Sequence, residues 1–477
     1  IFVKLTTDSG VVGYGEAYNA TFSAHITARM IEDMAERYLV GRDPHDIETL
    51  FRRCYSSGFT QRPDVSAMGC FSALEIACWD IIGKEADKPV YKLLGGKVHE
   101  KLRTYTYLYP QTGSVHSEDA HGKNVYNDPD LAAECAASYL AQGFSAVKLD
   151  PAGPYTAFDG HQPRLADIDL SARMLKAIRE AVGTRADILF GTHGQFTASG
   201  ALRMAAAIEP YDPLWFEEPV PPDMPEVMAE VARGTKIPIA TGERLTTKFE
   251  FARVIEARAA SILQPDLGRS GGILETKKIA AMAEAWHVQI APHCYCGPIV
   301  GAANIQLAVT LPNFLILESL KQWDGFHEKL LKNKIAWQDG YVIPSNEPGL
   351  GVELDAYYMD WSKIVIPQVF EEIGGRQLTQ PTSLSVNGGD ATIKGAELSI
   401  TARPMRSTPT ASYGLPKRAR KRRASRNIPH RSAPIGTRNS MTASTGSRAA
   451  MQSIRERRGT KPSTWPRRLH SGASICA

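Results

Sequence analysis

The sequence has few cysteines and no long apolar run. Seven cysteines are spread over 477 residues, at positions 54, 70, 78, 135, 294, 296 and 476. This number and spacing do not form a disulfide framework in a chain of this size, so we expect a reduced, cytoplasmic setting. Typical apolar runs, such as 204–208 and 314–317, fall well short of the roughly 20 residues that span a membrane. The start of the chain also lacks a secretory signal pattern, so no membrane partner is expected.

Acidic residues are nearly absent from the end of the chain. Residues 401–477 hold 18 of the 55 Lys and Arg residues but only one of the 51 Asp and Glu residues. Their net charge is therefore +17, whereas residues 1–400 carry −13. One interpretation is an arm that binds nucleic acid or another polyanion. The other is a disordered or non-native tail, such as a frameshifted read-through after about residue 370.

The second interpretation of the tail is favoured. The tail is rich in Ser, Thr, Pro, Gly and Ala and has little apolar periodicity, which is typical of a segment that does not fold alone. No aromatic residue interleaves with its basic run at 417–423. We therefore predict a disordered or non-native tail over 371–477 and do not expect a nucleic acid partner.

The first hundred residues indicate a small α+β domain. Hydrophobic residues make up 43% of the chain, an ordinary value for a globular protein. A predicted hairpin is followed by three predicted helices with apolar residues at helical spacing. The predicted strands and helices are 1–6, 11–16, 24–39, 43–56 and 66–86. We assign residues 1–100 to a domain that could cover the mouth of the structure that follows.

From residue 102 onward, short apolar runs alternate with amphipathic helices. Eight strands separated by helices are typical of parallel β/α units, and eight is the strand number of a TIM barrel. The predicted strands are 102–107, 146–149, 188–190, 214–216, 237–240, 261–263, 288–291 and 314–317. A doubly wound sheet is the alternative. The predicted barrel spans residues 101–330, and residues 331–370 are expected to return to the first domain.

Polar residues follow seven of these eight strands. Taken one at a time, each could be an ordinary residue at a strand-to-loop junction. In a TIM barrel, however, the carboxyl ends of all the strands meet at the catalytic mouth, so these residues would converge there. The most informative of these polar residues are Lys148, Asp150, His193, Glu217, Glu243, Asp266, His293 and Glu318.

Two kinds of chemistry are indicated by these residues. Carboxylates on adjacent strands, such as Glu217 and Glu243, repel each other unless a cation lies between them, and hard oxygen ligands favour Mg²⁺. A carboxylate beside His293, such as Asp266, would orient the imidazole and raise its basicity. A metal with a tuned base is suited to removing the proton α to a carboxylate.

Several motifs together resemble the enolase superfamily, mandelate racemase subgroup. They are SALEIACWDIIGK at 72–84, LLGG at 93–96, FEEP at 216–219, GER at 242–244, QPD at 264–266 and PH at 292–293. The resemblance covers about residues 1–355. It implies an N-terminal capping domain on a modified TIM barrel, with a first strand that would precede Ile1.

The resemblance also implies roles for individual residues. Glu217 and Glu243 correspond to Mg²⁺ ligands, Asp266 and His293 to a catalytic dyad, and Glu318 to the glutamate of the eighth strand. Within the subgroup the sequence is most similar to acid-sugar dehydratases of the D-galactonate dehydratase type. Those enzymes carry Asp-x-His after the third strand, where the Asp binds metal and the His protonates the leaving hydroxyl.

This chain departs from that pattern at one metal position. It has Gly191-Thr192-His193, so the histidine matches and the metal-binding aspartate is replaced by glycine. Either His193 binds the metal, or water fills the position, or the site is weakened. His193 is thus a candidate both for general acid and for metal ligand. We expect Gly191→Asp to tighten Mg²⁺ binding.

The expected function is Mg²⁺-dependent dehydration of a galactonate-like sugar acid to a 2-keto-3-deoxy acid through an enediolate. Lys148 and Glu318 would assist by charge and hydrogen bonding. One alternative is a cycloisomerase or epimerase of a sugar acid or lactone that uses the same enediolate. Another is an impaired or non-catalytic barrel with a basic nucleic-acid-binding arm. Racemases of the subgroup carry Lys-x-Lys after the second strand, and only Lys148 is kept here. We also expect a homo-oligomer.

Overall fold

The protein was analysed as a computed structural model. It describes residues 1–18, 21–110, 123–153 and 160–354 in full, and the backbone of five strands at 358–361, 365–373, 376–387, 391–394 and 399–402. Residues 403–477, with most of the basic tail, lie outside the described residues.

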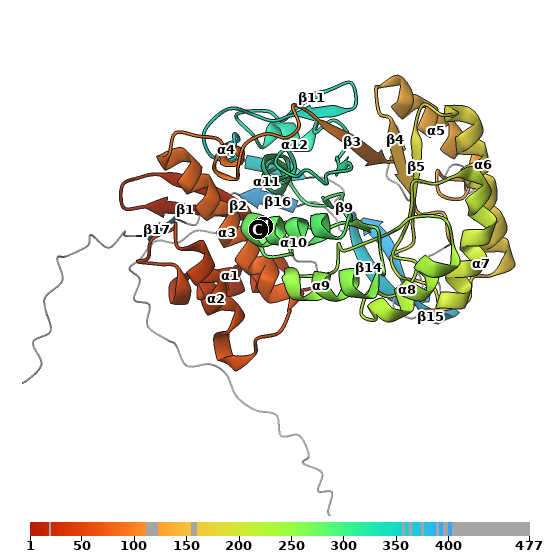
Figure 1. Cartoon of the computed structure of the whole chain (residues 1–477), viewed down its shortest axis with the longest axis horizontal. Helices are drawn as coiled ribbons and strands as arrows, with labels where there is room; N and C mark the ends of the chain where they lie inside the picture. Colours follow the sequence, from red (N-terminus) through yellow and green to blue (C-terminus); the bar gives the residue numbers. More distant parts are fainter. Residues whose placement is uncertain are drawn as a thin grey trace, which may run out of the picture. The chain divides into compact units, whose positions relative to one another are not determined.

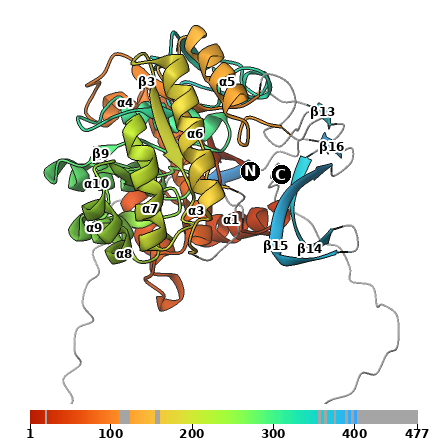
Figure 2. The same cartoon turned by 90° about the vertical axis from the view of Figure 1, so that its right-hand side faces the viewer.

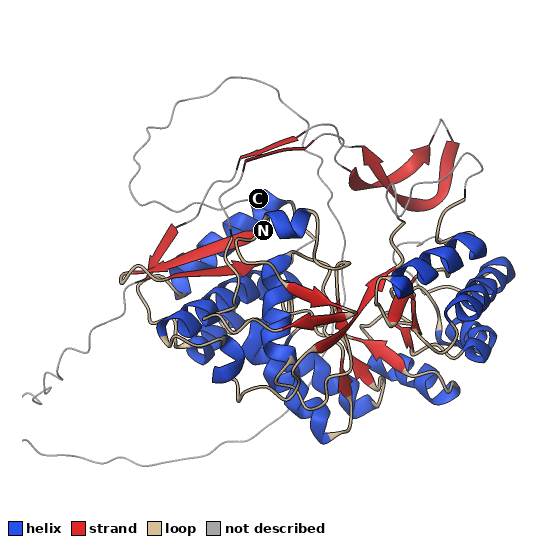
Figure 3. Ribbon diagram, turned by 90° about the horizontal axis from the view of Figure 1, so that it is seen from above, coloured by secondary structure: helices blue, strands red, loops and turns tan. Residues whose placement is uncertain are grey.

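Eight parallel strands form a closed barrel (Figures 1 and 3). Strands β3 to β9 pair in chain order, β10 pairs with β3, and Phe314 forms a parallel bridge with Ile290 of β9, which closes the ring. The strands are β3 Leu102–Tyr107, β4 Ala146–Leu149, β5 Asp187–Gly191, β6 Trp215–Glu217, β7 Ile239–Thr241, β8 Ile262–Leu263, β9 Gln289–Ile290 and β10 Leu317–Glu318. The TIM-type barrel predicted from the sequence is confirmed, and the doubly wound alternative is wrong.

A layer of apolar side chains packs inside the barrel. Each strand, or a residue next to it in the chain, contributes one side chain to this layer. Large and small residues alternate in part around the ring, which lets the layer fill a tapering interior. The layer consists of Tyr105, Ala146, Leu189, Trp215, Ala240, Ile262, Ala291 and Ile316. The polar residues that follow the strands lie next to this packed layer, at the carboxyl ends of the strands.

Helices between consecutive strands cover the outside of the barrel (Figure 2). Their apolar faces and the outward-facing strand residues form the largest core cluster of the protein. Successive helices from α5 to α10 pack side by side. The helices are α5 Pro129–Ala141, α6 Leu165–Val182, α7 Ala198–Ile208, α8 Pro225–Gly234, α9 Thr247–Ala257, α10 Gly272–Ala285 and α11 Pro298–Ala308.

The N-terminal region forms the predicted α+β capping domain. A hairpin packs on the long helix α3, and a separate hydrophobic core holds the region together. Its main elements are β1 Phe2–Thr7, β2 Val12–Glu16, α1 Ala24–Tyr38, α2 Ile47–Tyr55, α3 Val65–Glu85 and α4 Val90–Leu93.

Helix α3 corrects one expectation from the sequence. By length and composition alone it could cross a membrane, although no apolar stretch of that length was expected. In the structure 72% of its most apolar stretch is buried inside the protein, and α3 serves as the central helix of the capping domain. An all-round apolar helix is typical of such a core position.

Two buried carboxylates of the capping domain bind the amino ends of barrel helices. Glu75 accepts hydrogen bonds from the backbone N–H groups of Ile273 and Leu274 at 2.7 and 2.8 Å, at the start of α10. Glu16 accepts from the backbone N–H groups of Gly297 and Val300 at the start of α11. Because the amino ends of helices carry backbone N–H groups without intrahelical partners, these hydrogen bonds hold the cap on the barrel.

The residues after β10 contact both the barrel and the cap. Strand β12 (Tyr341–Ile343) pairs with β11 (Ala336–Gln338) and runs antiparallel to β3. Further on, the backbone N–H of Leu350 donates to the buried Asp80 of α3 at 2.9 Å. The backbone N–H of Val90 donates to the carbonyl of Gly349 at 3.0 Å. The segment predicted to return to the capping domain therefore reaches it at α3 and α4.

Beyond residue 354 only strand backbones are described. Strands β14 (Val365–Ile373) and β15 (Arg376–Asn387) form an antiparallel pair, as do β13 (Tyr358–Trp361) and β16 (Ala391–Lys394). Strand β17 (Ser399–Ala402) runs parallel to β1, at the edge of the sheet opposite to β2. The sequence had predicted a disordered or non-native tail from residue 371, so these strands extend regular structure beyond that boundary.

Candidate active site

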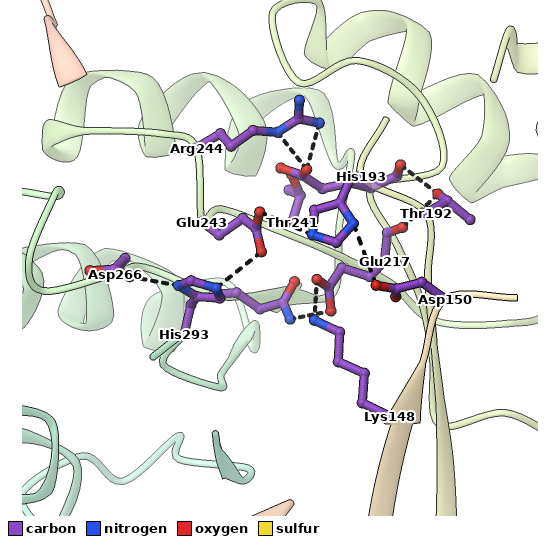
Figure 4. Close-up of polar contacts among 12 residues, drawn as sticks. Lys148, Asp150, Thr192, His193, Glu217, Thr241, Glu243, Arg244, Asp266 and His293 are labelled. Atoms are coloured by element: carbon purple, nitrogen blue, oxygen red, sulfur yellow. Dashed lines mark hydrogen bonds and ion pairs between the residues drawn. The ribbon is translucent and has the colours of Figure 1, made fainter. Parts of the chain in front are cut away.

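The carboxyl ends of the barrel strands bring all seven predicted site residues to one end of the barrel. Figure 4 shows six of them, all except Glu318. Each comes from the last residue of a strand or from the loop directly after it, except Lys148, which precedes the end of β4 by one residue. These residues are Lys148, His193, Glu217, Glu243, Asp266, His293 and Glu318. Apart from His193, which is intermediate, all are buried.

His293 and Asp266 form a tight pair. Nδ1 of His293 donates to Oδ2 of Asp266 at 2.6 Å, and the other carboxylate oxygen of Asp266 accepts from the backbone N–H of Gly268 at 2.7 Å. The imidazole is therefore held with Nε2 directed toward Glu243 and Glu318, at 3.3 and 3.6 Å. Burial alone would lower the pKa of His293, but Glu318, Glu243 and Asp266 outweigh it and raise that pKa to about 10.

Lys148 and Glu217 form a buried ion pair on the floor of the site. Nζ of Lys148 lies 2.5 Å from Oε1 of Glu217. The other oxygen of Glu217 accepts from Gln264 at 2.7 Å and from Trp215 at 3.0 Å. Burial raises the pKa of Glu217, while Lys148 opposes that shift. Burial alone would lower the pKa of Lys148, but Glu217 and Glu318 reverse the effect and raise it. Lys148 is therefore a fixed cation.

Glu243 lies between the two histidines. Its Oε2 is 3.3 Å from Nε2 of His293, and its Oε1 is 3.6 Å from Nε2 of His193. Burial would raise the pKa of Glu243, but His293, His193 and Lys148 outweigh it and hold the pKa well below its ordinary value. Within the described part of the chain, Oε2 of Glu243 is buried and accepts no hydrogen bond.

His193 bridges the two sides of the site. Its Nδ1 lies 3.6 Å from Oδ2 of Asp150, while its Nε2 faces Glu243. The backbone φ of His193 is +49°, a left-handed conformation that is uncommon for a residue with a side chain and is often kept at functional sites. Burial lowers its pKa, but Glu243 and Asp150 together raise it above its ordinary value. The ring is therefore suited to carrying a proton.

Further contacts complete the wall of the site. Glu318 accepts from the backbone N–H of Cys294 at 2.8 Å. Arg244 donates from Nε to Glu218 at 2.7 Å, so Arg244 fixes the loop after β6. Tyr18, from the capping domain, stacks on His293 with ring centroids 6.1 Å apart, and the guanidinium of Arg269 lies 3.7 Å from the tyrosine ring centroid. The sequence carried no signal for Tyr18, because only packing of the cap on the barrel brings it there.

The donor set suits a hard divalent cation. Glu217 ends β6, and Glu243 lies in the loop directly after the adjacent strand β7. Mg²⁺ is a hard cation that prefers such carboxylate oxygens. The buried Oε2 of Glu243 accepts no hydrogen bond from the described residues and lies 3.3 Å from Nε2 of His293, so it is a candidate donor to an ion that replaces this contact. As the side chains stand, the described residues include no three His, Cys, Asp or Glu groups already converged on one point. Lys148 and the two histidines lie against the carboxylates and balance their charge instead.

Comparison with known proteins agrees with this architecture. The family described as "Mandelate racemase / muconate lactonizing enzyme, N-terminal domain" matches residues 1–95, and "Enolase C-terminal domain-like" matches residues 130–358. A mandelate racemase/muconate lactonizing enzyme from Sulfitobacter has a solved structure with a TM-score of 0.71 and 54% sequence identity, covering 74% of this chain and 87% of that one.

Two functionally named relatives are dehydratases. A D-xylonate dehydratase from Haloferax volcanii is 34% identical over 380 residues, which cover 78% of this chain and 87% of the relative. A D-galactonate dehydratase from Ralstonia pickettii is 35% identical over 364 residues, covering 74% of this chain and 88% of the relative. The chain therefore belongs to the mandelate racemase subgroup of the enolase superfamily, as an enzyme of the carbon–oxygen lyase class that resembles acid-sugar dehydratases.

Proposed function

We propose that the protein dehydrates a galactonate-like sugar acid to a 2-keto-3-deoxy acid in a Mg²⁺-dependent reaction. The observation that carries the proposal is the pair of histidines on either side of Glu243, with Nε2 of His293 and Nε2 of His193 each facing that carboxylate. One imidazole is held by Asp266 and the other lies beside Asp150. Such a pair can remove a proton on one side of a substrate and supply one on the other.

His293 is the proposed base. Asp266 fixes the tautomer in which Nδ1 carries the proton, so Nε2 is the atom that takes the proton from C2 of the substrate. With a pKa raised to about 10, the imidazole is charged at neutral pH when the surrounding carboxylates are not balanced by a metal. Glu217 and Glu243 would hold Mg²⁺, whose charge would stabilise the enediolate and offset the carboxylates that keep His293 protonated.

His193 is the proposed acid. As the C3–O bond breaks, His193 gives its proton to the departing hydroxyl, which leaves as water. The resulting enol takes a proton at C3 and becomes the 2-keto-3-deoxy acid. With no metal bound, burial lowers the pKa of His193, but the carboxylates of Glu243 and Asp150 on either side of the ring raise it above its ordinary value.

Lys148 and Glu318 assist in this proposal by charge and hydrogen bonding. Glu318, which lies 3.6 Å from Nε2 of His293, helps to position the proposed base. Lys148 holds a fixed positive charge against Glu217, beside the position where the substrate carboxylate gains negative charge. A second base on the opposite face would be needed for a two-base racemase. The raised pKa of Lys148 and its buried ion pair do not suit Lys148 to that task. Dehydration is proposed over epimerisation because the named relatives are dehydratases. The homo-oligomer and the cytoplasmic setting stay predictions.

A product assay tests this function. The purified protein is incubated with D-galactonate, D-gluconate and D-xylonate, with Mg²⁺ or with EDTA, and 2-keto acids are measured as semicarbazones. We expect a 2-keto-3-deoxy product from at least one aldonate, and only when Mg²⁺ is present. In the same assay His293→Asn should give no product, because it removes the proposed base. The matched control is His287→Asn, since His287 is an exposed histidine just after the end of α10. It should keep the activity, and its φ of +57° is tolerated by asparagine.

A further inference from the structure

We propose that Asp150 supplies the third metal-binding carboxylate that residue 191 lacks. This inference rests on the proposed Mg²⁺ site and assigns a ligand from the end of β4 rather than from the end of β5. The sequence pattern alone indicates His193 or water for this position, and Asp150 stands where racemases of the subgroup carry the second lysine of Lys-x-Lys.

The strand register sets Asp150 level with position 191. In the β4–β5 ladder, Lys148 pairs with Leu189 and Leu149 pairs with Phe190, so Asp150 follows directly beside Gly191. Gly191 in turn pairs with Glu217 on β6. Leu189 belongs to the interior layer of the barrel. Since side chains alternate along a strand, Asp150 and position 191 both face the interior at the level of Glu217.

The carboxylate of Asp150 fills the space that a side chain at position 191 would take. A Cβ atom built on Gly191 would overlap Oδ1 of Asp150, and would lie 3.1 Å from its Cγ and 3.3 Å from Cε of Lys148. The backbone φ of Gly191 is not in the left-handed region, so the chain does not need glycine there for conformational reasons. The absence of a side chain at position 191 therefore leaves the space that the carboxylate of Asp150 occupies.

The neighbours of Asp150 also match a ligand. Its Oδ2 faces Nδ1 of His193 at 3.6 Å, while the opposite nitrogen of the same ring faces Glu243. Asp150 and Glu243 thus flank one imidazole from both sides, and the side chain of Asp150 is only 11% exposed. Oε2 of Glu243 is buried and accepts no hydrogen bond from the described residues, but it faces Nε2 of His293 at 3.3 Å. In the proposed site Asp150, Glu217 and Glu243 would turn toward one cation, which would take the place of their present contacts with Lys148 and the two histidines. His193 is then left for proton donation.

This arrangement reverses the expectation for Gly191→Asp. A new aspartate at position 191 would overlap the carboxylate already present and would place a second negative charge against it. The single variant should therefore not tighten metal binding. Asp150→Ala combined with Gly191→Asp moves the carboxylate from one strand to its neighbour, and this exchange should restore a three-carboxylate site.

The test measures metal binding directly. Mn²⁺ binding is followed by electron paramagnetic resonance, and Mg²⁺ binding by titration calorimetry, in the full-length protein without substrate. Asp150→Asn should weaken binding by at least about tenfold, since it removes one charge next to the ion. Gly191→Asp should not improve binding, and the Asp150→Ala/Gly191→Asp exchange should bind within a few-fold of the wild type. Asp169→Asn, an exposed carboxylate on α6, is the matched control and should bind as the wild type does.

The outcomes distinguish a failure of the Asp150 assignment from a failure of the proposed metal-dependent function. Wild-type affinity in Asp150→Asn, with a normal melting temperature, would overturn the assignment of Asp150. A Gly191→Asp variant that binds more tightly than the wild type would overturn it as well. If the wild type itself binds neither Mn²⁺ nor Mg²⁺, the proposed metal-dependent function fails, whatever Asp150 does. Proton relaxation of the bound Mn²⁺ gives a further readout, because loss of a protein ligand should add a coordinated water.

Discussion

Nδ1 of His293 lies 2.6 Å from Oδ2 of Asp266, and this contact points Nε2 of the imidazole at Glu243 and Glu318. The two residues lie just after adjacent strands, β8 and β9, and their backbones form a parallel bridge. The pair therefore depends on the barrel register and not on a flexible loop. A base held this way has one available nitrogen and one direction in which to take a proton.

His293→Asn should abolish turnover and also the exchange of the substrate C2 proton with deuterated water. Asp266→Asn should lower the exchange rate by at least about 100-fold, because the ring loses the partner that fixes its tautomer. Exchange is followed by proton NMR of the aldonate. Exchange that persists at the wild-type rate in His293→Asn would show that another residue is the base.

His193→Asn should stop elimination while C2 proton exchange stays measurable. In the proposed scheme His193 acts only when the C3–O bond breaks, whereas His293 acts earlier. The two rates are measured in one NMR experiment, with His287→Asn as the control. Loss of both exchange and elimination in His193→Asn, together with loss of Mn²⁺ binding, would identify His193 as a metal ligand instead.

Lys148→Met should destabilise the metal-free protein by about 3 kcal/mol, because it leaves the buried Glu217 carboxylate without its cation. Addition of Mg²⁺ should recover part of this loss, since the ion replaces the missing positive charge. Urea unfolding measures both effects. The Lys148→Met/Glu217→Gln variant is the control, and it should be more stable than Lys148→Met without metal. Equal stabilities of the two variants would contradict the ion-pair account.

The contact between cap and barrel at Glu75 should depend on pH. Burial raises the pKa of Glu75 to about 8, above the ordinary value near 4.5 that applies in the unfolded chain. The folded state therefore binds one more proton between these values. The associated stability is full below about pH 4.5 and is lost as the pH rises through about 8.

Glu75→Gln removes this titration and keeps a side chain of similar size. Between about pH 5 and pH 8.5 the melting temperature of the wild type should fall further than that of the variant, by on the order of 5 °C. Parallel pH profiles of the two proteins would contradict a raised pKa at Glu75. Differential scanning fluorimetry across the pH range gives the comparison.

The barrel and the polar residues at its mouth could be predicted because each strand is short, apolar and followed by a turn into polar residues. Lys148, Glu217 and Glu318, for example, needed only the strand assignment and the general rule that barrel chemistry lies at the carboxyl ends. Their roles stay predictions, but the structure brings them to one end of the barrel as expected.

The features that could not be predicted depend on distances between separate elements. Asp150 and Gly191 are 41 positions apart, and only the β4–β5 register shows that the carboxylate of one fills the space of the other. Tyr18 reaches His293 from the capping domain through packing that leaves no periodic pattern in the sequence. The pairing of β17 with β1 likewise joins opposite ends of the described chain.

The most direct test of the central claim is the NMR spectrum of an aldonate incubated with the protein and Mg²⁺ in deuterated water. The account predicts a 2-keto-3-deoxy acid that carries one deuteron at C3, because the enol takes its C3 proton from solvent after water has left. Appearance of the C2 epimer with deuterium at C2, and no keto acid, would instead show that the enzyme forms the enediolate but does not eliminate, and would contradict the account.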